Sequence, residues 1–436
     1  MRYISTKSND SPVSLVEAVN RCMAPDGGIY MPEVIPTIPR ALFNNIGEMN
    51  LREIAYVVAS SFFANDIPGN VLKTMVDESF AFDAPLVEMP GNVYVLELFN
   101  GPTLTFKDYG ARFMARLMKY LDGREKDTNR TILVATTGNT GAAAANGFYH
   151  LNGINVCVLY PKGYLNSTQT SMFTGLGENI HPIEVAGSVE DCKRLVTTAM
   201  ADESLSHLRL TGANSINIAR LIPQITFAMY AYSRLQALGV ADADKAVYSM
   251  PCGNLSNLVG TAMAKRMGLS IGGIIGATNS NDQLRRLMNG GDDTPQKVQP
   301  QRTFAPSIDM SYPSGWPRLK HLYQGDLAAM NADIKAAAPV ANDVISATIN
   351  RLRREAGYTI DTHGAVAYAA TAEVSTKAPK VVFATGHPAK HLDIMTRVTG
   401  SSIELPIQLT NFMTVRRHSI IIPPTLPALR KQLLTL

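Results

Sequence analysis

Charged side chains are scarce in this sequence, where they make up 17% of 436 residues, against roughly 25% in an average globular domain. Disordered chains combine high charge with few apolar residues, so the 46% of hydrophobic residues excludes general disorder. The formal net charge is only +4, and the basic clusters at 351–354 and 416–418 are short. They indicate solvated helix or loop faces rather than patches for a phosphate backbone, and we expect no nucleic-acid partner.

Cysteines and long apolar runs are also few. The sequence has four cysteines and no CxxC pair, which argues against a zinc ribbon, a redox dithiol or a disulfide framework. No run approaches the roughly 18 apolar residues of a membrane span, and the first ten residues lack the apolar stretch of a secretory signal. We therefore expect a cytoplasmic protein without a membrane partner.

One pair of histidines has a spacing that could bind a metal. His387 and His391 are four residues apart, but the chain has no HExxH motif of the kind that zinc enzymes use. A structural role is favoured for both side chains, and no metal site is expected.

The pattern of apolar residues changes near residue 92. Before it, apolar residues recur at helical spacing, as over 51–63, and predict a mostly helical N-terminal accessory domain, 1–92. After it, helical stretches alternate with apolar runs that predict strands at 92–98, 131–136, 154–160, 181–185, 246–250, 271–277 and 380–385. A long helix is predicted over 214–238. This alternation is typical of α/β folds with parallel sheets covered on both faces, where ligands bind at the carboxyl ends of the strands.

Two turns at predicted strand ends combine small and polar residues. They are TTGNTG (136–141) and CGNLSN (252–257), and each opens a helix. Free backbone N–H groups and the positive end of the helix dipole suit a phosphate or a carboxylate there. The alternative is that Gly, Asn and Ser only cap the helices. Neither turn matches GxGxxG or GxxxxGK[ST], so nucleotide binding has no direct support.

Lys107 stands at the predicted start of a helix, where electrostatics disfavours a lysine. The apolar residues of this helix recur every fourth position and predict a core face; they are Tyr109, Phe113, Leu117 and Leu121. One interpretation of Lys107 is a surface lysine that extends its amine into solvent. The other is a lysine in an apolar setting, whose lowered pKa makes it a better nucleophile or Schiff-base former.

Together these motifs resemble the fold type II pyridoxal-phosphate enzymes, and among them the threonine synthases. The similarity covers nearly the whole chain and includes LELFNGPTLTFKDYGARFMARL (96–117), ATTGNTGAAAANGFY (135–149), ANSINIARLIPQ (213–224), GNLSN (253–257), PSGWPR (313–318), THGAVAY (362–368) and ATGHPAKH (384–391). The lysine of FKD and the NSIN segment are specific to this group, whereas the glycine-containing turns are shared by the superfamily.

The resemblance implies a role for each site residue. Lys107 would carry pyridoxal 5'-phosphate as a Schiff base, Asn139 would bind its phenolic oxygen, and Thr385 would face its pyridine nitrogen. The residues implied to cradle the cofactor phosphate are Gly253, Asn254, Leu255, Ser256 and Asn257. Those implied to hold the substrate carboxylate are Thr136, Thr137 and Thr140, and those implied to hold the substrate phosphate are Lys162, Asn214, Asn217 and Arg220.

The resemblance also implies a fold and a reaction. The fold would be two-lobed, like that of the tryptophan synthase β-subunit, with a smaller α/β lobe at 93–225 and a larger one at 226–436 that could interleave. The smaller lobe would hold the strands near 131, 154 and 181, and the larger those near 95, 246, 271 and 380. The reaction would be a β,γ-elimination and replacement, with Lys107 as the general base, that converts O-phospho-L-homoserine and water into L-threonine and phosphate. The partner would be this small phosphorylated amino acid, and the enzyme would be a monomer or homodimer.

Several departures from the family pattern fall near the expected substrate. TSGDTG has become TTGNTG, GNFGN has become GNLSN, Gln-Glu has become Gln169-Thr170, PHAAV has become THGAV, and TAHPAKF has become TGHPAKH. They leave open a phospholyase or dehydratase that acts on phosphothreonine, phosphoserine or a related amino acid. A non-catalytic binding protein on the same scaffold is a further alternative, but a pure binder would not need Lys107.

Overall fold

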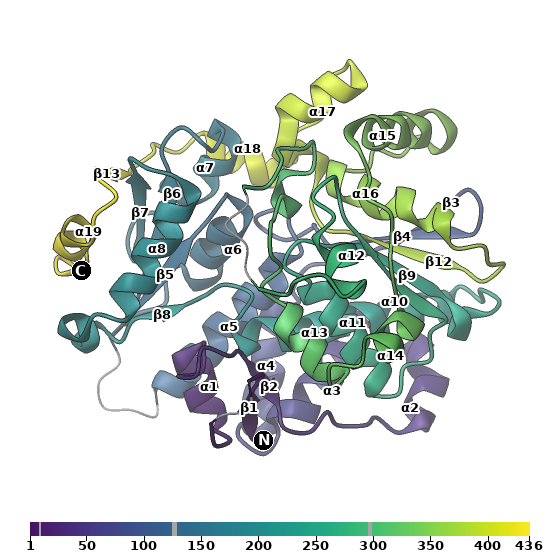
Figure 1. Cartoon of the computed structure of the whole chain (residues 1–436), viewed down its shortest axis with the longest axis horizontal. Helices are drawn as coiled ribbons and strands as arrows, with labels where there is room; N and C mark the ends of the chain where they lie inside the picture. The colour runs from purple at the N-terminus through teal and green to yellow at the C-terminus, as the bar shows by residue number, and fades with distance from the viewer. Residues whose placement is uncertain (8–9, 124–128, 295–298) are drawn as a thin grey trace.

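Two sheets form the frame of the structure, a computed structural model that describes residues 1–7, 10–123, 129–294 and 299–436 (Figure 1). The five-stranded sheet is parallel throughout and runs in the order β13 (Ile420–Ile422), β7 (Ile180–Val185), β6 (Ile154–Pro161), β5 (Arg130–Ala135) and β8 (Thr211–Gly212). The six-stranded sheet runs in the order β11 (Ile334–Ala336), β10 (Gly273–Ala277), β9 (Val247–Pro251), β12 (Lys380–Ala384), β4 (Val93–Glu97) and β3 (Leu86–Met89). Its pairs are parallel except for the antiparallel pair β3·β4.

The predicted strands are all present and fall into two sheets as expected. Those near 131, 154 and 181 are β5, β6 and β7, and those near 95, 246, 271 and 380 are β4, β9, β10 and β12. The sequences of these strands are continuous apolar runs because each sheet is covered on both faces. In β10, for example, Ile274 belongs to one buried core and its neighbour Ile275 to another, as the alternation of side chains along a strand requires.

The chain passes between the two sheets more than once. β4 is part of the six-stranded sheet although it precedes β5 to β8, and β13 near the C-terminus returns to the edge of the five-stranded sheet. The two sheets therefore interleave along the sequence. The boundaries predicted at 92 and 225 stay predictions, and neither range coincides with one complete sheet.

The N-terminal region combines helices with a small sheet. Its helices are α1 (Leu15–Arg21), α2 (Arg40–Asn45), α3 (Leu51–Phe63) and α4 (Gly69–Ser79), and α3 spans the segment predicted from its apolar spacing. The antiparallel pair β1 (Tyr3–Ser5) and β2 (Tyr30–Pro32) was not predicted, because three residues are too few to show an alternating pattern.

The long helix predicted over 214–238 is interrupted. The structure has α9 (Ile218–Leu221), a 3-10 turn η3 (Ile222–Gln224) and α10 (Ile225–Ala237). Pro223 lies in the 3-10 turn. Proline has no backbone N–H and clashes with the preceding helical turn, so a continuous α-helix is disfavoured at this point.

Two helices carry the residues of greatest interest. α5 (Lys107–Asp122) buries the predicted stripe Tyr109, Phe113, Leu117 and Leu121. It packs closely on α6 (Asn139–Phe148), because a Cβ added at Gly147 would lie 2.9 Å from the backbone carbon of Ala111.

The remaining helices cover the sheets and their edges. They are α7 (Ser167–Thr174), α8 (Val189–Met200), α11 (Ser256–Arg266), α12 (Gln283–Met288), α13 (Trp316–Leu322), α14 (Leu327–Asp333), α15 (Asn342–Ala356), α16 (Thr362–Ala370), α17 (Leu392–Thr399), α18 (Ile407–Met413) and α19 (Leu426–Leu433). Among the described residues, no helix has the length and apolar character to cross a membrane.

One buried arginine ties the N-terminal region to the rest of the chain. Arg318, in α13, is 2% exposed. Its guanidinium donates to the carbonyl oxygen of Tyr30 in β2 and to those of Ser215 and Ile216, over distances between 2.6 and 3.1 Å. The segment 213–217, which contains the NSIN motif, is therefore held by the same side chain as the N-terminal sheet.

Candidate active site

Lys107 is the first residue of α5 and lies between α6, which packs on the five-stranded sheet, and the end of β12 in the six-stranded sheet. Its Nζ donates to Thr140 Oγ1 at 3.1 Å, which links it to the start of α6. The preceding residues bond to the end of β12, because Phe106 N donates to the carbonyl oxygen of Thr385 at 3.1 Å and Thr105 Oγ1 does so at 3.2 Å. Three predicted site residues, Lys107, Thr140 and Thr385, are thus brought together from three elements.

The surroundings of Lys107 favour a neutral amine. Burial, together with the nearby positive charges of Arg220 and Lys390, lowers the pKa of Lys107 to about 7. The same burial lowers the pKa of Lys390 to about 8 and that of Arg220 to about 10. Lys107 is half-buried and its amine bonds to Thr140, so it is not a lysine that extends into solvent. The direction of its pKa shift is the one expected of a lysine in an apolar setting.

The first turn, 136–141, is held together by one hydroxyl group. Thr136 Oγ1 accepts hydrogen bonds from Gly138 N at 3.0 Å and from Gly141 N at 2.9 Å. Gly138 has a φ of +118°, which a residue with a side chain rarely adopts. Thr137 is exposed, and Asn139 and Thr140 are half-buried. The Thr136 oxygen thus shapes the turn, while Thr137 and Thr140 remain closest to solvent.

The second turn, 252–257, is more deeply buried. Asn254 Oδ1 accepts from Ser256 N at 3.0 Å and from Ser256 Oγ at 2.9 Å, and Asn254 Nδ2 donates to Ser215 Oγ at 2.8 Å. Leu255 adopts the left-handed conformation, with a φ of +67°. A Cβ added at Gly253 would lie 3.2 Å from the Cα of Ile308, so this turn is packed directly against a neighbouring backbone.

The four residues expected to bind a substrate phosphate are placed differently from one another. Arg220 is 2% exposed and donates to the carbonyl oxygens of Ala213 and Lys107, while its Nε has no partner among the described residues. Asn214 and Lys162 are exposed. Asn217 is fully buried. Its Oδ1 accepts from Ala219 N at 3.0 Å and caps α9, and its Nδ2 donates to Val19 O at 2.8 Å.

Two of the predicted substrate-binding residues already have hydrogen-bond partners within the protein. The polar atoms of Asn217 are committed to α9 and to α1, and the hydroxyl oxygen of Thr136 is committed to its own turn. Removing the hydrogen-bond partners of a buried polar group destabilises the folded state. We infer a structural role for Asn217. The Thr136 hydroxyl accepts both of its hydrogen bonds, so its proton can still be donated to a substrate carboxylate.

Three further residues lie at the site but were not among the predicted site residues. Lys390 is 1% exposed, and its Nζ donates to the carbonyl oxygen of Thr103. Asp108 is equally buried, and its Oδ2 accepts from Thr103 N at 2.8 Å. Ser307 Oγ accepts from Asn139 Nδ2 at 3.1 Å. The contacts of Lys390 and Ser307 join segments that are far apart in the sequence, whereas Thr103 and Asp108 are five residues apart. The FKD and PAKH motifs could have drawn attention to Asp108 and Lys390.

The side chain of His387, one of the two histidines spaced four residues apart, has a partner within the protein. His387 Nδ1 accepts from Ala389 N at 3.1 Å and caps the turn that follows. Burial lowers the pKa of His387 to about 4. Within the ranges that the structure describes, no cluster of three or more potential metal ligands is present.

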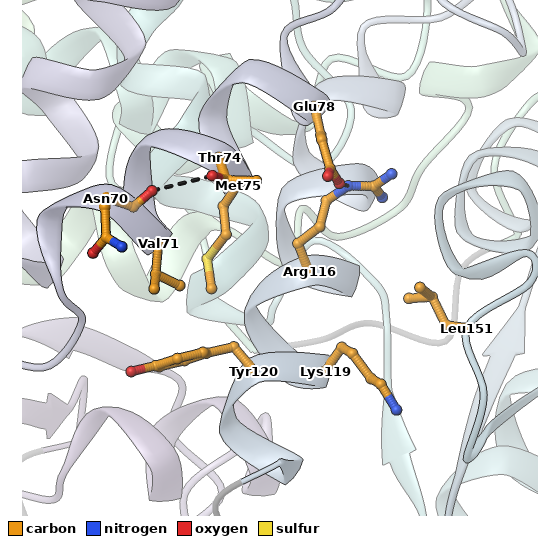
Figure 2. A pocket seen from close by; sticks show the side chains of 9 residues that line it. All are labelled: Asn70, Val71, Thr74, Met75, Glu78, Arg116, Lys119, Tyr120 and Leu151. Atoms are coloured by element: carbon orange, nitrogen blue, oxygen red, sulfur yellow. Dashed lines mark hydrogen bonds and ion pairs between the residues drawn. The ribbon is translucent and has the colours of Figure 1, made fainter.

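A separate surface cavity lies toward the other end of α5. It has a volume of about 400 Å³, and α4 and α5 provide most of its lining (Figure 2). Its charged side chains already have partners, since Arg116 pairs with Glu78 at 2.8 Å and Lys119 Nζ donates to Asn152 O at 2.7 Å. This cavity is distinct from the site around Lys107.

Comparison with protein families defines the class to which this site belongs. Residues 79–386 match the family of pyridoxal-phosphate dependent enzymes, and residues 2–80 match the threonine synthase N terminus. The two-sheet frame, the lysine between two strand–turn–helix motifs and these matches define a pyridoxal-phosphate-dependent enzyme of fold type II.

Individual relatives narrow the class further. The threonine synthase of Escherichia coli K12 is 33% identical over 99% of both chains. The crystal structure of the E. coli enzyme superposes with a TM-score of 0.91 at 32% identity and covers 100% of both chains. A pyridoxal-phosphate-bound threonine synthase from Brucella melitensis superposes with a TM-score of 0.91 at 29% identity, over 99% of this chain and 98% of that one. The chain belongs to the threonine synthase family.

The residues of the site fit the cofactor of this family, pyridoxal phosphate. Lys107 has the lowered pKa that attachment to a carbonyl group requires. Asn139 Oδ1 and Asn257 Oδ1 are buried without a hydrogen-bond partner among the described residues, as expected where a ligand completes the site. Gly253 lets the backbone of the second turn lie close to its neighbours.

Proposed function

We propose that this chain converts O-phospho-L-homoserine and water into L-threonine and inorganic phosphate. The observation that carries the proposal is Lys107, whose amine bonds to Thr140 of the first turn and has a pKa of about 7. A lysine in that state can take up and release protons near neutral pH. The full-length similarity to threonine synthases supports the same reaction.

Each element of the site has a role in this proposal. Lys107 holds the cofactor, and the second turn, Gly253 to Asn257, binds the cofactor phosphate. Asn139 would bind the phenolic oxygen of the cofactor, and Thr385 would face its pyridine nitrogen. When bound, pyridoxal phosphate withdraws electrons from the amino acid attached to it and so acidifies the adjacent C–H bonds.

The chain's own residues then move protons and orient the substrate. Lys107, freed when the substrate amine replaces it, would accept the α-proton at its neutral amine, return that proton to the substrate, and then accept a β-proton. Thr140 Oγ1 would keep Nζ in place by accepting its hydrogen bond. Thr136, Thr137 and Thr140 would bind the substrate carboxylate at the start of α6, where the helix dipole favours an anion.

The substrate phosphate is assigned to Arg220, with Asn214 and Lys162 near the solvent. Arg220 is buried, and no carboxylate pairs with it among the described residues. A buried cation whose hydrogen bonds go only to carbonyl oxygens keeps its charge available for an anion. Its unpartnered Nε is a donor that a phosphate oxygen would satisfy.

The decisive experiment measures both products. Purified protein is supplied with O-phospho-L-homoserine, and phosphate release and threonine formation are followed in parallel; equal rates are expected. Release of phosphate without threonine would replace the proposal with a phospholyase, and turnover of phosphothreonine or phosphoserine in preference would do the same. Lys107→Ala serves as the inactive control. The cytoplasmic location, the lack of a nucleic-acid partner and the monomeric or homodimeric state stay predictions.

A further inference from the structure

Asn139 is held from one side only. Its Nδ2 donates to Ser307 Oγ at 3.1 Å, whereas its Oδ1 is buried and has no hydrogen-bond partner among the described residues. Leaving a buried amide oxygen without a hydrogen bond costs free energy. Either a ligand satisfies this oxygen, or the amide rotates so that its oxygen and nitrogen exchange places. What fixes Ser307 therefore also fixes Asn139.

Ser307 is itself fixed by a buried histidine. Its backbone N donates to His363 Nε2 at 3.0 Å. An imidazole nitrogen that accepts a hydrogen bond carries no proton, so the proton of the neutral ring is on Nδ1. That nitrogen lies 2.7 Å from Asp361 Oδ2, which accepts its hydrogen bond. The hydrogen bonds on both sides of the ring thus select one tautomer.

Asp361 is the rigid end of this series of contacts. It caps α16, where its Oδ1 accepts from Gly364 N at 2.8 Å and its Oδ2 accepts from His363 N at 3.1 Å. Asp361 and His363 are 3% and 4% exposed. The ring of His391 packs against that of His363, with their centroids 5.3 Å apart. The His363 ring is therefore enclosed on several sides.

The series of contacts joins the two halves of the molecule. α16 packs on β9, β10 and β12 of the six-stranded sheet, whereas α6 packs on β5 and β6 of the five-stranded sheet. The turn that contains Ser307, η5 (Pro306–Ile308), lies between them and also contacts Gly253 of the second turn. Two parts of the cofactor site are thus in contact with one short turn.

We propose that His363 is a positioning residue of the cofactor site and acts on Asn139 through Ser307. The proposal rests on the cofactor-binding role that the proposed function gives to Asn139. The Ser307 hydroxyl has one donor and two acceptor sites, so it can pair with either end of the Asn139 amide. If the ligand presents an oxygen that needs a donor, the Asn139 amide rotates so that its nitrogen donates to the ligand. Ser307 Oγ then donates to Asn139 Oδ1.

Two substitutions of His363 separate its two hydrogen bonds. In His363→Gln, the side-chain amide reaches the Nε2 position and its oxygen can still accept from Ser307 N. In His363→Asn, the shorter amide reaches only the Nδ1 position and keeps the contact with Asp361. The proposal predicts that His363→Asn weakens binding of pyridoxal phosphate to the apoprotein by roughly fivefold to tenfold, as expected for one lost hydrogen bond, while His363→Gln stays within about twofold.

The measurement is a fluorescence titration of apoprotein with pyridoxal phosphate. The single tryptophan, Trp316, follows Gly315, whose N donates to the carbonyl oxygen of Asn254 in the second turn, so it reports on this site. Asn139→Ala is the reference for complete loss of the contact. His181→Asn is the matched control, because His181 is in β7 and bonds to Asn155 at 3.2 Å; it should leave the dissociation constant unchanged.

A second pair of variants tests the same contacts without altering His363. Ser307→Ala should weaken cofactor binding as much as His363→Asn, and Ser307→Thr, which keeps the hydroxyl, should restore it to within about twofold. Both residues act through Asn139. The dissociation constant of the double variant His363→Asn/Ser307→Ala should therefore be no more than about twofold higher than that of the single variant that binds the cofactor less tightly. Urea unfolding identifies variants that fail to fold. If a His363 variant does not fold, the cofactor affinities of Ser307→Ala and Ser307→Thr test the proposal instead.

Three results would overturn the proposal. If Asn139→Ala weakens cofactor binding while His363→Asn does not, His363 has no positioning role, although the role of Asn139 stands. If the effects of His363→Asn and Ser307→Ala multiply in the double variant, the two residues act independently. If Asn139→Ala itself leaves binding unchanged, its assigned role fails, and the inference about His363 fails with it, whereas the proposed reaction is judged by its products.

Discussion

The turns at 136–141 and 252–257 begin with the same pattern of strand, small polar residues and helix, yet they are built differently. The first is held by the Thr136 oxygen and leaves Thr137 exposed. The second is buried against Ile308 and is fixed by the Asn254 side chain. An open turn suits a ligand that is exchanged in every cycle, and a buried one suits a ligand that stays bound. The pattern therefore identifies the turn, and burial indicates which ligand it serves.

Lys107 touches the first turn and serves the ligand of the second, so its removal should have the largest effect. Lys107→Ala is expected to lower kcat by on the order of 10³-fold or more, because the general base is lost. Purified Lys107→Ala should also lack the visible absorbance of covalently held cofactor. A persistent chromophore that borohydride reduces in this variant would refute the assignment.

The buried turn should tolerate no additional atom. In Gly253→Ala the new Cβ would lie 3.2 Å from Ile308 Cα and 3.3 Å from the carbonyl oxygen of Ser307, both backbone atoms that cannot move easily. Overpacking of this kind costs roughly 1–3 kcal/mol, so cofactor affinity is expected to fall by about tenfold to a hundredfold. Equilibrium titration of the apoprotein measures it. The matched control is Gly273→Ala at the start of β10, where the nearest atom to the added Cβ is 4.0 Å away and φ is not positive. Unchanged affinity in Gly253→Ala would mean that this turn is not the buried cofactor turn.

The charge state of Lys107 should appear in the pH dependence of cofactor attachment. Its pKa is about 7 because burial, Arg220 and Lys390 disfavour the ammonium form. Below this pKa the amine is protonated and unreactive, and above it the amine is free. The rate of attachment to apoprotein should therefore rise about tenfold per pH unit below pH 7 and level off above it. Stopped-flow absorbance gives this rate.

A matched pair of arginine variants tests the cause of that pH dependence. Arg220→Gln removes a neighbouring positive charge, so the pKa of Lys107 should rise and the profile should move to higher pH. Arg112→Gln, on the same helix as Lys107, removes a charge that does not act on this amine and should leave the profile in place. A flat profile between pH 6 and 8, or equal shifts in both variants, would contradict the assigned cause.

The open turn should show the smallest effect, and it should fall on the substrate. Thr137→Ala removes one exposed hydroxyl and is expected to raise KM roughly twofold to tenfold, in line with one hydrogen bond, while the cofactor dissociation constant stays the same. Ser167→Ala, at the exposed start of α7, is the control. A loss of cofactor affinity in Thr137→Ala would remove the distinction between the two turns.

Local patterns predicted the parts of the fold that are locally determined. The apolar runs of β5, β6, β7, β9, β10 and β12 are continuous because their sheets are covered on both faces, and the spacing in α3 marks one buried stripe. The predicted position of Lys107 at a helix start is also correct. β13 has only three residues, and two of its isoleucines are about half exposed, so its pattern could not reveal that it joins β7.

The hydrogen-bond partners in the site could not be predicted in the same way. Asn139 and Ser307 are 168 residues apart, and Lys390 and Thr103 are 287 apart. Nothing in either local segment specifies these distant partners, because the fold as a whole sets them. The same holds for Asn217, whose motif points to a ligand but whose amide bonds to α1.

The contacts of Arg318 have a consequence for any attempt to divide the molecule. Its guanidinium uses the Tyr30 carbonyl oxygen as the acceptor for two of its hydrogen bonds. A shortened chain that began after residue 80 would lose this acceptor, and Arg318 would keep only its bonds to Ser215 and Ile216. Losing one partner of a buried, hydrogen-bonded cation is strongly destabilising. The N-terminal region is therefore an integral part of the catalytic fold, and the two should unfold together rather than as separable modules.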